Sequence, residues 1–177
     1  MKKILVIILV VIGLVSCKDE KKDPNQGDAT KLPETFNVAF NLTVQKDDTF
    51  HLLYTEDGTL NFSDDKSVAV LVKGSTNPQD IIFKLPVDVL PTKIRLDFGK
   101  NKEQGDIVVN SMKAKYFSKV FEAKSNVVKQ YFYFNDFQMS YDEKTSSVKP
   151  IVGKDGSYAP LMWSNELLTD EFVKLVK

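Results

Sequence analysis

The 177-residue chain has only one cysteine, one histidine and one tryptophan, and its 24 basic and 24 acidic side chains leave no net charge. A single cysteine excludes an intramolecular disulfide and a thiolate-rich zinc site, and a single histidine excludes a metal centre built from several histidines. The chain also lacks the excess positive charge that binds a phosphate backbone, so nucleic acid is not an expected partner. A Gly-x-Ser-x-Gly elbow for a nucleophilic serine is absent.

The first 16 residues have the pattern of an export signal. Met1-Lys2-Lys3 gives a positively charged start, and residues 4–15 are aliphatic apart from Gly13. This run is shorter than the roughly 20 residues that a bilayer core requires, but it suits the apolar centre of a signal peptide. We therefore expect residues 1–16 to be removed as a signal peptide.

The residues at the end of this segment resemble the lipobox of bacterial lipoproteins. They read Leu14-Val15-Ser16-Cys17, and the resemblance implies that Cys17 is lipidated and becomes the first residue of the mature chain. A multiply acylated cysteine anchors a protein to a membrane without a spanning helix. The alternative is an ordinary signal peptide that ends near Ser16 and leaves Cys17 as a free thiol.

Lys18-Asp19-Glu20 follows directly and resembles the short export signal of surface lipoproteins in Bacteroidota. The resemblance implies a protein held in the outer membrane and facing the cell exterior, although any charged tether has a similar sequence. Residues 17–34 are expected to be a disordered linker, because nine of residues 18–34 are charged and only Ala29 and Leu32 are apolar.

Residues 35–177 are long enough for one domain with its own core, and their apolar residues recur mainly with a period of two. The clearest case is the alternation from Phe36 to Val44. Strands are predicted at 36–45, 50–55, 68–73, 80–85, 93–98, 106–116, 127–138 and 157–163. Strands that follow one another without helices indicate an all-β antiparallel sandwich.

Only the end of the chain has helical spacing. Ser164 is the expected N-cap of a short helix in which Leu168, Phe172, Leu175 and Val176 form one apolar stripe. We expect this helix to pack along an edge or end of the sandwich.

Two adjacent stretches resemble the β-sandwiches of galactose-binding-like, carbohydrate-binding modules. They are residues 83–99, which include the strand Ile94-Arg95-Leu96-Asp97, and residues 104–113, in which aliphatic residues alternate. The resemblance implies a jelly-roll fold and a glycan-binding ancestry. Any antiparallel hairpin with a glycine-containing turn has a related pattern, and a fold does not by itself identify a ligand.

Several residues are candidates for glycan binding. Within the predicted strand 127–138, Tyr131 and Tyr133 would lie on one face and form a platform that stacks against a sugar ring. Trp163 is a second candidate for stacking. Arg95 and Asp97 share a strand face and could bind sugar hydroxyls through charge-assisted hydrogen bonds. The alternative interpretations are a strand buried on both faces, a core tryptophan and a simple salt bridge.

No cofactor is expected, apart from a structural calcium for which Asp64 and Asp65 are the candidates. These residues lack the alternating spacing of a dedicated calcium loop, and a solvated turn is the simpler interpretation. His51 is interpreted as an ordinary strand residue. No catalytic residue is identified, although a glycosidase that uses only two carboxylates is compatible with the sequence.

The sequence therefore predicts a non-catalytic lipoprotein of the outer-membrane surface that acts as a carbohydrate-binding module. The alternative is a structural or protein-interaction lipoprotein, such as an accessory subunit of an envelope complex. The predicted partners are the membrane, through the lipid on Cys17, and either a glycan or another envelope protein.

Overall fold

The computed structural model describes residues 34–177. The predicted signal peptide 1–16, the lipidation site Cys17, the export signal Lys18-Asp19-Glu20 and the linker up to residue 33 lie outside the described residues. No helix within the described part is both long and apolar enough to cross a bilayer.

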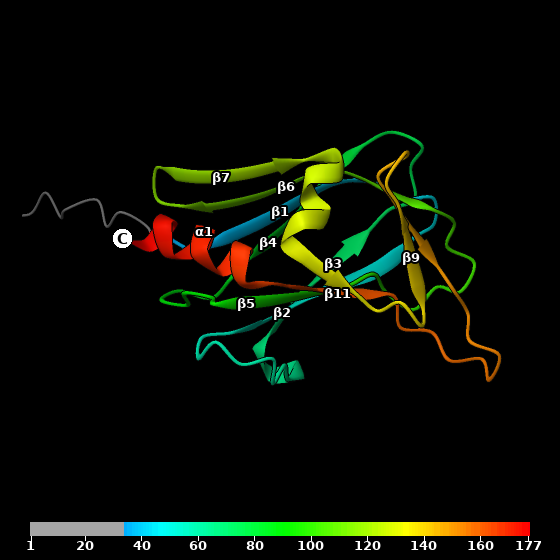
Figure 1. Cartoon of the computed structure of the whole chain (residues 1–177), viewed down its shortest axis with the longest axis horizontal. Helices are drawn as coiled ribbons and strands as arrows, with labels where there is room; N and C mark the ends of the chain where they lie inside the picture. Colours follow the sequence, from blue (N-terminus) through cyan, green and yellow to red (C-terminus); the bar gives the residue numbers. More distant parts are fainter. Residues whose placement is uncertain (1–33) are drawn as a thin grey trace, which may run out of the picture. The chain divides into compact units, whose positions relative to one another are not determined.

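Eleven strands, two short 3-10 helices and one α-helix follow one another along the described chain (Figure 1). They are β1 Asn37–Thr43, β2 Asp48–Thr55, η1 Asp64–Lys66, β3 Ser67–Val72, β4 Gln79–Lys84, β5 Lys93–Asp97, β6 Ile107–Tyr116, β7 Lys119–Lys124, η2 Ser125–Tyr131, β8 Phe132–Phe134, β9 Met139–Asp142, β10 Ser147–Pro150, β11 Leu161–Ser164 and α1 Glu166–Val176.

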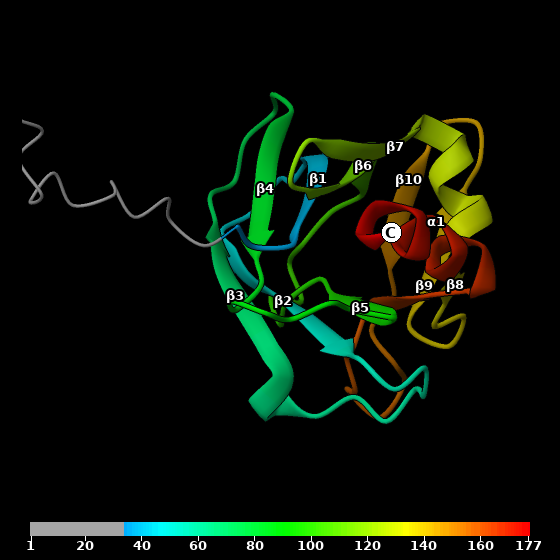
Figure 2. The ribbon, with the colours of Figure 1, turned by 90° about the vertical axis from the view of Figure 1, so that its left-hand side faces the viewer.

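The strands form two antiparallel sheets, which confirms the predicted all-β sandwich. One sheet has the order β4-β1-β6-β10-β9, with β7 also paired to β6, and the other has the order β3-β2-β5-β11-β8. Figure 2 shows the two sheets as separate layers, with α1 between them at one end. The helix contacts β6 and β7 of the first sheet and β11 of the second.

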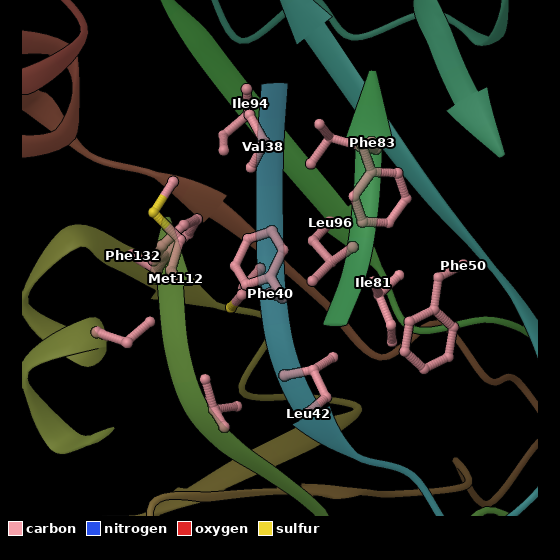
Figure 3. Packing of buried hydrophobic residues seen from close by; sticks show 14 of the residues in the cluster. Val38, Phe40, Leu42, Phe50, Ile81, Phe83, Ile94, Leu96, Met112 and Phe132 are labelled. Atoms are coloured by element: carbon pink, nitrogen blue, oxygen red, sulfur yellow. The ribbon is translucent and has the colours of Figure 1, made fainter. Parts of the chain in front are cut away.

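The core lies between the facing sides of the two sheets (Figure 3). In β1, Val38, Phe40 and Leu42 are fully buried, and the residues between them are partly exposed, as the period of two predicts. The ring of Phe40 packs edge-on against Phe83 of β4 and tilted against Phe132 of β8, which belongs to the opposite sheet. Aromatic and aliphatic side chains from both sheets therefore form one continuous core.

A β-bulge keeps both halves of β6 facing this core. The β1–β6 register shifts between Asn41 and Leu42, which lie opposite Ser111 and Val109, so that Asn110 is an extra residue. Before the bulge Val109 is buried, and after it Met112 is buried. The extra residue thus shifts the inward and outward alternation of side chains in β6, the longest strand, so that apolar residues on both sides of the bulge face the core.

The predicted strand 127–138 is correct only over residues 132–134, since residues 135–138 form a turn. Residues 125–131 form the 3-10 helix η2, and only Phe132–Phe134 form a strand. With three residues per turn, Val128 and Tyr131 lie on the same side of η2. Val128 is buried, and Tyr131 packs edge-on against Phe121 of β7 with ring centroids 5.0 Å apart. Packing of η2 against β6, β7 and α1 outweighs the strand preference of this aromatic run.

The helix begins one residue later than predicted. Asn165, not Ser164, is the N-cap, and its side-chain oxygen accepts hydrogen bonds from the backbone N–H groups of Leu167 and Leu168. Ser164 is instead the last residue of β11, and its hydroxyl accepts a hydrogen bond from the N–H of Ile94. Leu168, Phe172 and Leu175 are buried as predicted, whereas Val176 is exposed.

Candidate functional site

The outer face of the five-stranded sheet carries a row of side chains from four adjacent strands. Trp163 on β11 lies directly opposite Tyr133 on β8 and, on its other side, opposite Arg95 on β5. Arg95 in turn lies opposite Leu53 on β2. Since residues that face one another across paired strands point to the same side of a sheet, all four side chains lie on the face away from the core.

Tyr133 and Trp163 form an aromatic platform at one end of this row. Their ring centroids are 6.0 Å apart and their planes are tilted by 43°. Half of the surface of Tyr133 is exposed, and Trp163 is partly exposed because its neighbours Met162 and Ser164 point inward. The platform therefore offers aromatic surface to solvent on one side of the molecule.

Glu166, the first residue of α1, steadies Tyr133. The Tyr133 hydroxyl donates to the Glu166 carboxylate at 3.4 Å, and the Lys93 ammonium lies 3.2 Å from the same carboxylate. The backbone N–H at the helix start lowers the pKa of Glu166 below its usual value, and the hydrogen bond from Lys93 lowers it further. The carboxylate consequently stays ionised and continues to accept the tyrosine hydroxyl.

Arg95 and Asp97 lie beside the platform and are paired with each other. The Arg95 Nε and one terminal nitrogen donate to the two Asp97 oxygens at 2.7 and 2.8 Å. The guanidinium also lies over the ring of Phe62, 5.5 Å from its centroid. The pair is the same-face salt bridge considered from the sequence. The two hydrogen bonds between Arg95 and Asp97, together with the Phe62 ring against the guanidinium, fix the orientation of both side chains.

A hollow of about 370 Å³ lies on the same face, next to this ion pair. Its floor is formed by His51, Leu53, Asp97 and Leu161, from β2, β5 and β11. Its walls come from three segments: Asp64 and Ser67, Gly99-Lys100, and Tyr158-Ala159-Pro160. A hollow of this size is at the small end of the range of ligand-binding pockets.

The 99–101 segment of the wall is held by one carboxylate. Asp48 accepts hydrogen bonds from the backbone N–H groups of Thr49, Lys100 and Asn101 at 2.8 to 3.1 Å. The 156–160 segment is tied to it, since the N–H of Phe98 donates to the carbonyl of Pro160 and Lys102 donates to the carbonyl of Gly156. These contacts fix two walls of the hollow against each other.

Tyr158 in the wall has an unpartnered hydroxyl. Among the described residues nothing lies within hydrogen-bonding distance of this buried oxygen. Burial, with a smaller contribution from the negative charge of Asp48, raises the pKa of Tyr158 to about 12. Tyr158 is therefore neutral at physiological pH and contributes its ring to the wall.

The structure brings together most of the predicted glycan-binding residues. Tyr133, Trp163, Arg95 and Asp97 share one face, but Tyr131 does not, because it lies in η2 and packs against Phe121. The predicted pairing of Tyr131 with Tyr133 is therefore wrong. Trp163 lies inside the sheet, since β11 is between β5 and β8.

The two calcium candidates lie in η1, but they differ in their surroundings. Asp64 lines the hollow, and Asp65 accepts a hydrogen bond from the Ser63 hydroxyl, which lowers its pKa. Within residues 34–177 there is no group of three or more acidic, histidine or cysteine side chains that could hold a metal ion.

Sequence reasoning missed Phe62 and Tyr158, and it placed His51 only on a strand. Phe62 is a single aromatic residue in a polar loop. Its isolation there was the one local signal that its ring packs against another side chain. Tyr158 and His51 meet at the hollow only through the pairing of strands that are far apart in sequence, so no local pattern could have identified them.

Comparisons with known proteins found no matching family model, no similar curated protein and no similar solved structure. The resemblance of residues 83–113 to galactose-binding-like modules, with the jelly roll that it implies, stays a prediction.

Proposed function

We propose that this chain is a non-catalytic lipoprotein of the outer-membrane surface, anchored through Cys17, and that its sandwich binds carbohydrate on the outer face of the five-stranded sheet. The observation that carries the proposal is the placement of the Tyr133–Trp163 platform beside the Arg95–Asp97 pair. Aromatic rings stack on the C–H faces of sugar rings, and adjacent charged groups bind the hydroxyls that project from the ring edge.

The residues around the platform favour binding over catalysis. Both oxygens of Asp97 accept hydrogen bonds from Arg95, so this carboxylate is already engaged as a hydrogen-bond acceptor. The other carboxylate at the hollow, Asp64, lies outside the sheet, in the 3-10 helix η1. A fixed platform and a fixed ion pair supply the preorganised contacts that recognition requires.

The first experiment is a glycan-array and polysaccharide pull-down screen with the full-length chain in a detergent without a sugar headgroup. Wild type is expected to bind at least one glycan, and Tyr133→Ala and Trp163→Ala are expected to weaken that binding at least tenfold. Tyr131→Ala is the matched control, because its ring packs against Phe121 of β7 and not against Trp163. Absence of glycan binding by wild type would exclude the proposed function, and full binding by Tyr133→Ala and Trp163→Ala would exclude the platform.

The anchor is tested separately in cells. Metabolic labelling with palmitate is expected to mark wild type but not Cys17→Ser, and globomycin is expected to block maturation of the wild-type chain. Protease treatment of intact cells is expected to digest the domain, and replacement of Lys18-Asp19-Glu20 by neutral residues is expected to protect it. An unlabelled wild-type protein would contradict the lipid anchor.

The second candidate function is a structural or protein-interaction lipoprotein, such as an accessory subunit of an envelope complex. It is favoured by β3, an edge strand without charged residues whose Leu71 is 82% exposed. Crosslinking in membranes distinguishes the two: this candidate predicts a protein adduct that Leu71→Lys abolishes, with no effect of Tyr133→Ala.

A further inference from the structure

The hollow and the platform are consecutive positions along the same strands. Leu161 in the hollow floor is two residues before Trp163 on β11, and Asp97 is two residues after Arg95 on β5. Residues two apart on a strand point to the same face and are separated by about 7 Å. A ligand that stacks on the platform can therefore place its neighbouring ring in the hollow.

Two segments line the hollow at the end that lies away from the platform. The 99–101 segment is fixed by the Asp48 carboxylate, and it is joined to the 156–160 segment by the Phe98–Pro160 and Lys102–Gly156 hydrogen bonds. A polymer that enters from the platform meets these two joined segments as a wall. The end of a chain fits this arrangement better than a chain that continues past the two segments.

The charges at the hollow balance. Asp97 is neutralised by Arg95, and the remaining charged side chains in the lining are Asp64 and Lys100, of opposite sign. Leu161 offers apolar surface to a ring face, while His51 and Ser67 offer hydrogen-bonding groups to hydroxyls. An uncharged polyhydroxylated ring fits this lining better than an acidic one.

We propose that the hollow holds the terminal ring of a neutral glycan while the penultimate ring stacks on Tyr133 and Trp163, so that the protein recognises chain ends. The inference rests on the proposed carbohydrate-binding function and assigns the hollow as its second subsite. Asp97, in the floor of the hollow, is paired with Arg95 beside the platform.

The chain contains its own reporter for the test, because Trp163 is its only tryptophan. The full-length protein, in a polyoxyethylene detergent, is titrated with cello-, xylo- and manno-oligosaccharides of one to six units and with soluble polymers of the same sugars. Oligogalacturonides of matched length are the acidic comparison. Affinity is expected to rise from one unit to two or three and then stay constant, and polymers are expected to bind according to their concentration of chain ends.

The variant Ala159→Leu fills the hollow from its wall and is expected to weaken oligosaccharide binding at least tenfold. Ser140→Leu is the control, since Ser140 is also exposed but lies on β9 of the other sheet, outside the lining. His51→Ala, which removes a floor side chain, is expected to weaken binding as well. Circular dichroism establishes that each variant is folded.

The outcomes separate the two proposals. Binding that depends on Tyr133 but is unchanged in both Ala159→Leu and His51→Ala would overturn the hollow as a subsite and leave the proposed function intact. Stronger binding of polymers than of oligosaccharides at equal chain-end concentration would overturn chain-end recognition, and preference for oligogalacturonides would overturn the neutral ligand. Failure of wild type to bind any glycan would overturn the proposed function itself.

Discussion

Gly99 lies directly against the Asp48 carboxylate, so that a Cβ on Gly99 would be 2.2 Å from the Asp48 Cγ. The glycine also has a φ of 83°, in the region that residues with a side chain avoid. This close approach lets Asp48 accept the N–H groups of Lys100 and Asn101 and thereby sets the wall of the hollow.

Gly99→Ala is expected to lower the free energy of unfolding by about 1–3 kcal/mol, through backbone strain and the displacement of Asp48. Gly58→Ala is the matched control, since Gly58 has a φ of 78° but no atom within 4 Å of the added Cβ. Urea unfolding monitored by Trp163 fluorescence measures both. Equal losses in the two variants would show that the contact with Asp48 contributes nothing.

Asn165→Ala is expected to destabilise the domain by about 1 kcal/mol, because it removes the N-cap of α1. Asn165 also donates from its side-chain nitrogen to the carbonyl of Gln130 in η2, at 2.7 Å. Asn165→Asp keeps the capping oxygen but loses this donor, so thermal unfolding of the two variants separates the roles. If Asn165→Asp is as unstable as Asn165→Ala, the cap is not the stabilising contact.

Arg95→Lys is expected to weaken glycan binding and to lower the free energy of unfolding by about 1 kcal/mol, because lysine can neither form the two-pronged contact with Asp97 nor lie flat over Phe62. Both side chains of the pair are mostly buried, at 24% and 28% exposure. Lys113→Ala, which removes a more exposed pair with Glu122 at 3.9 Å, is expected to change neither quantity. Denaturant unfolding and Trp163 fluorescence titration measure the two effects.

Tyr158→Phe is expected to leave stability at pH 7 unchanged or slightly increased, since the buried hydroxyl has no hydrogen-bond partner among residues 34–177. The pKa of Tyr158 is about 12 in the folded protein and about 10 in an unfolded chain. As the pH rises from about 10 to about 12, the unfolded state loses this proton first, and the free energy of unfolding falls.

Tyr158→Phe has no hydroxyl to titrate at this position. Its free energy of unfolding is therefore expected to fall less steeply than that of wild type over the same pH range. Chemical denaturation at intervals between pH 7 and pH 12 measures the difference. Identical slopes for the two proteins would contradict the raised pKa of Tyr158.

Much of the fold could be predicted because burial on one face leaves a period of two. The alternation of Val38, Phe40 and Leu42 identifies β1, and similar patterns predicted β2 to β6 to within a few residues. The strands that were not predicted, β7, β9 and β10, are short or have polar and charged residues on their exposed side, and each buries only one or two side chains. Such strands are stabilised by pairing with a neighbour that lies elsewhere in the sequence.

By itself the sequence determined the class of the fold, the main strands, the buried stripe of the C-terminal helix and the outward alternation that puts Arg95 beside Asp97, because each depends on residues close together in the chain. Only the tertiary structure decided that Tyr133 contacts Trp163 and that Tyr131 belongs to the 3-10 helix η2. It also decided that His51, Asp64 and Tyr158 line one hollow. Those relationships depend on strand register and on packing between distant segments, and local sequence periodicity carries no information about either.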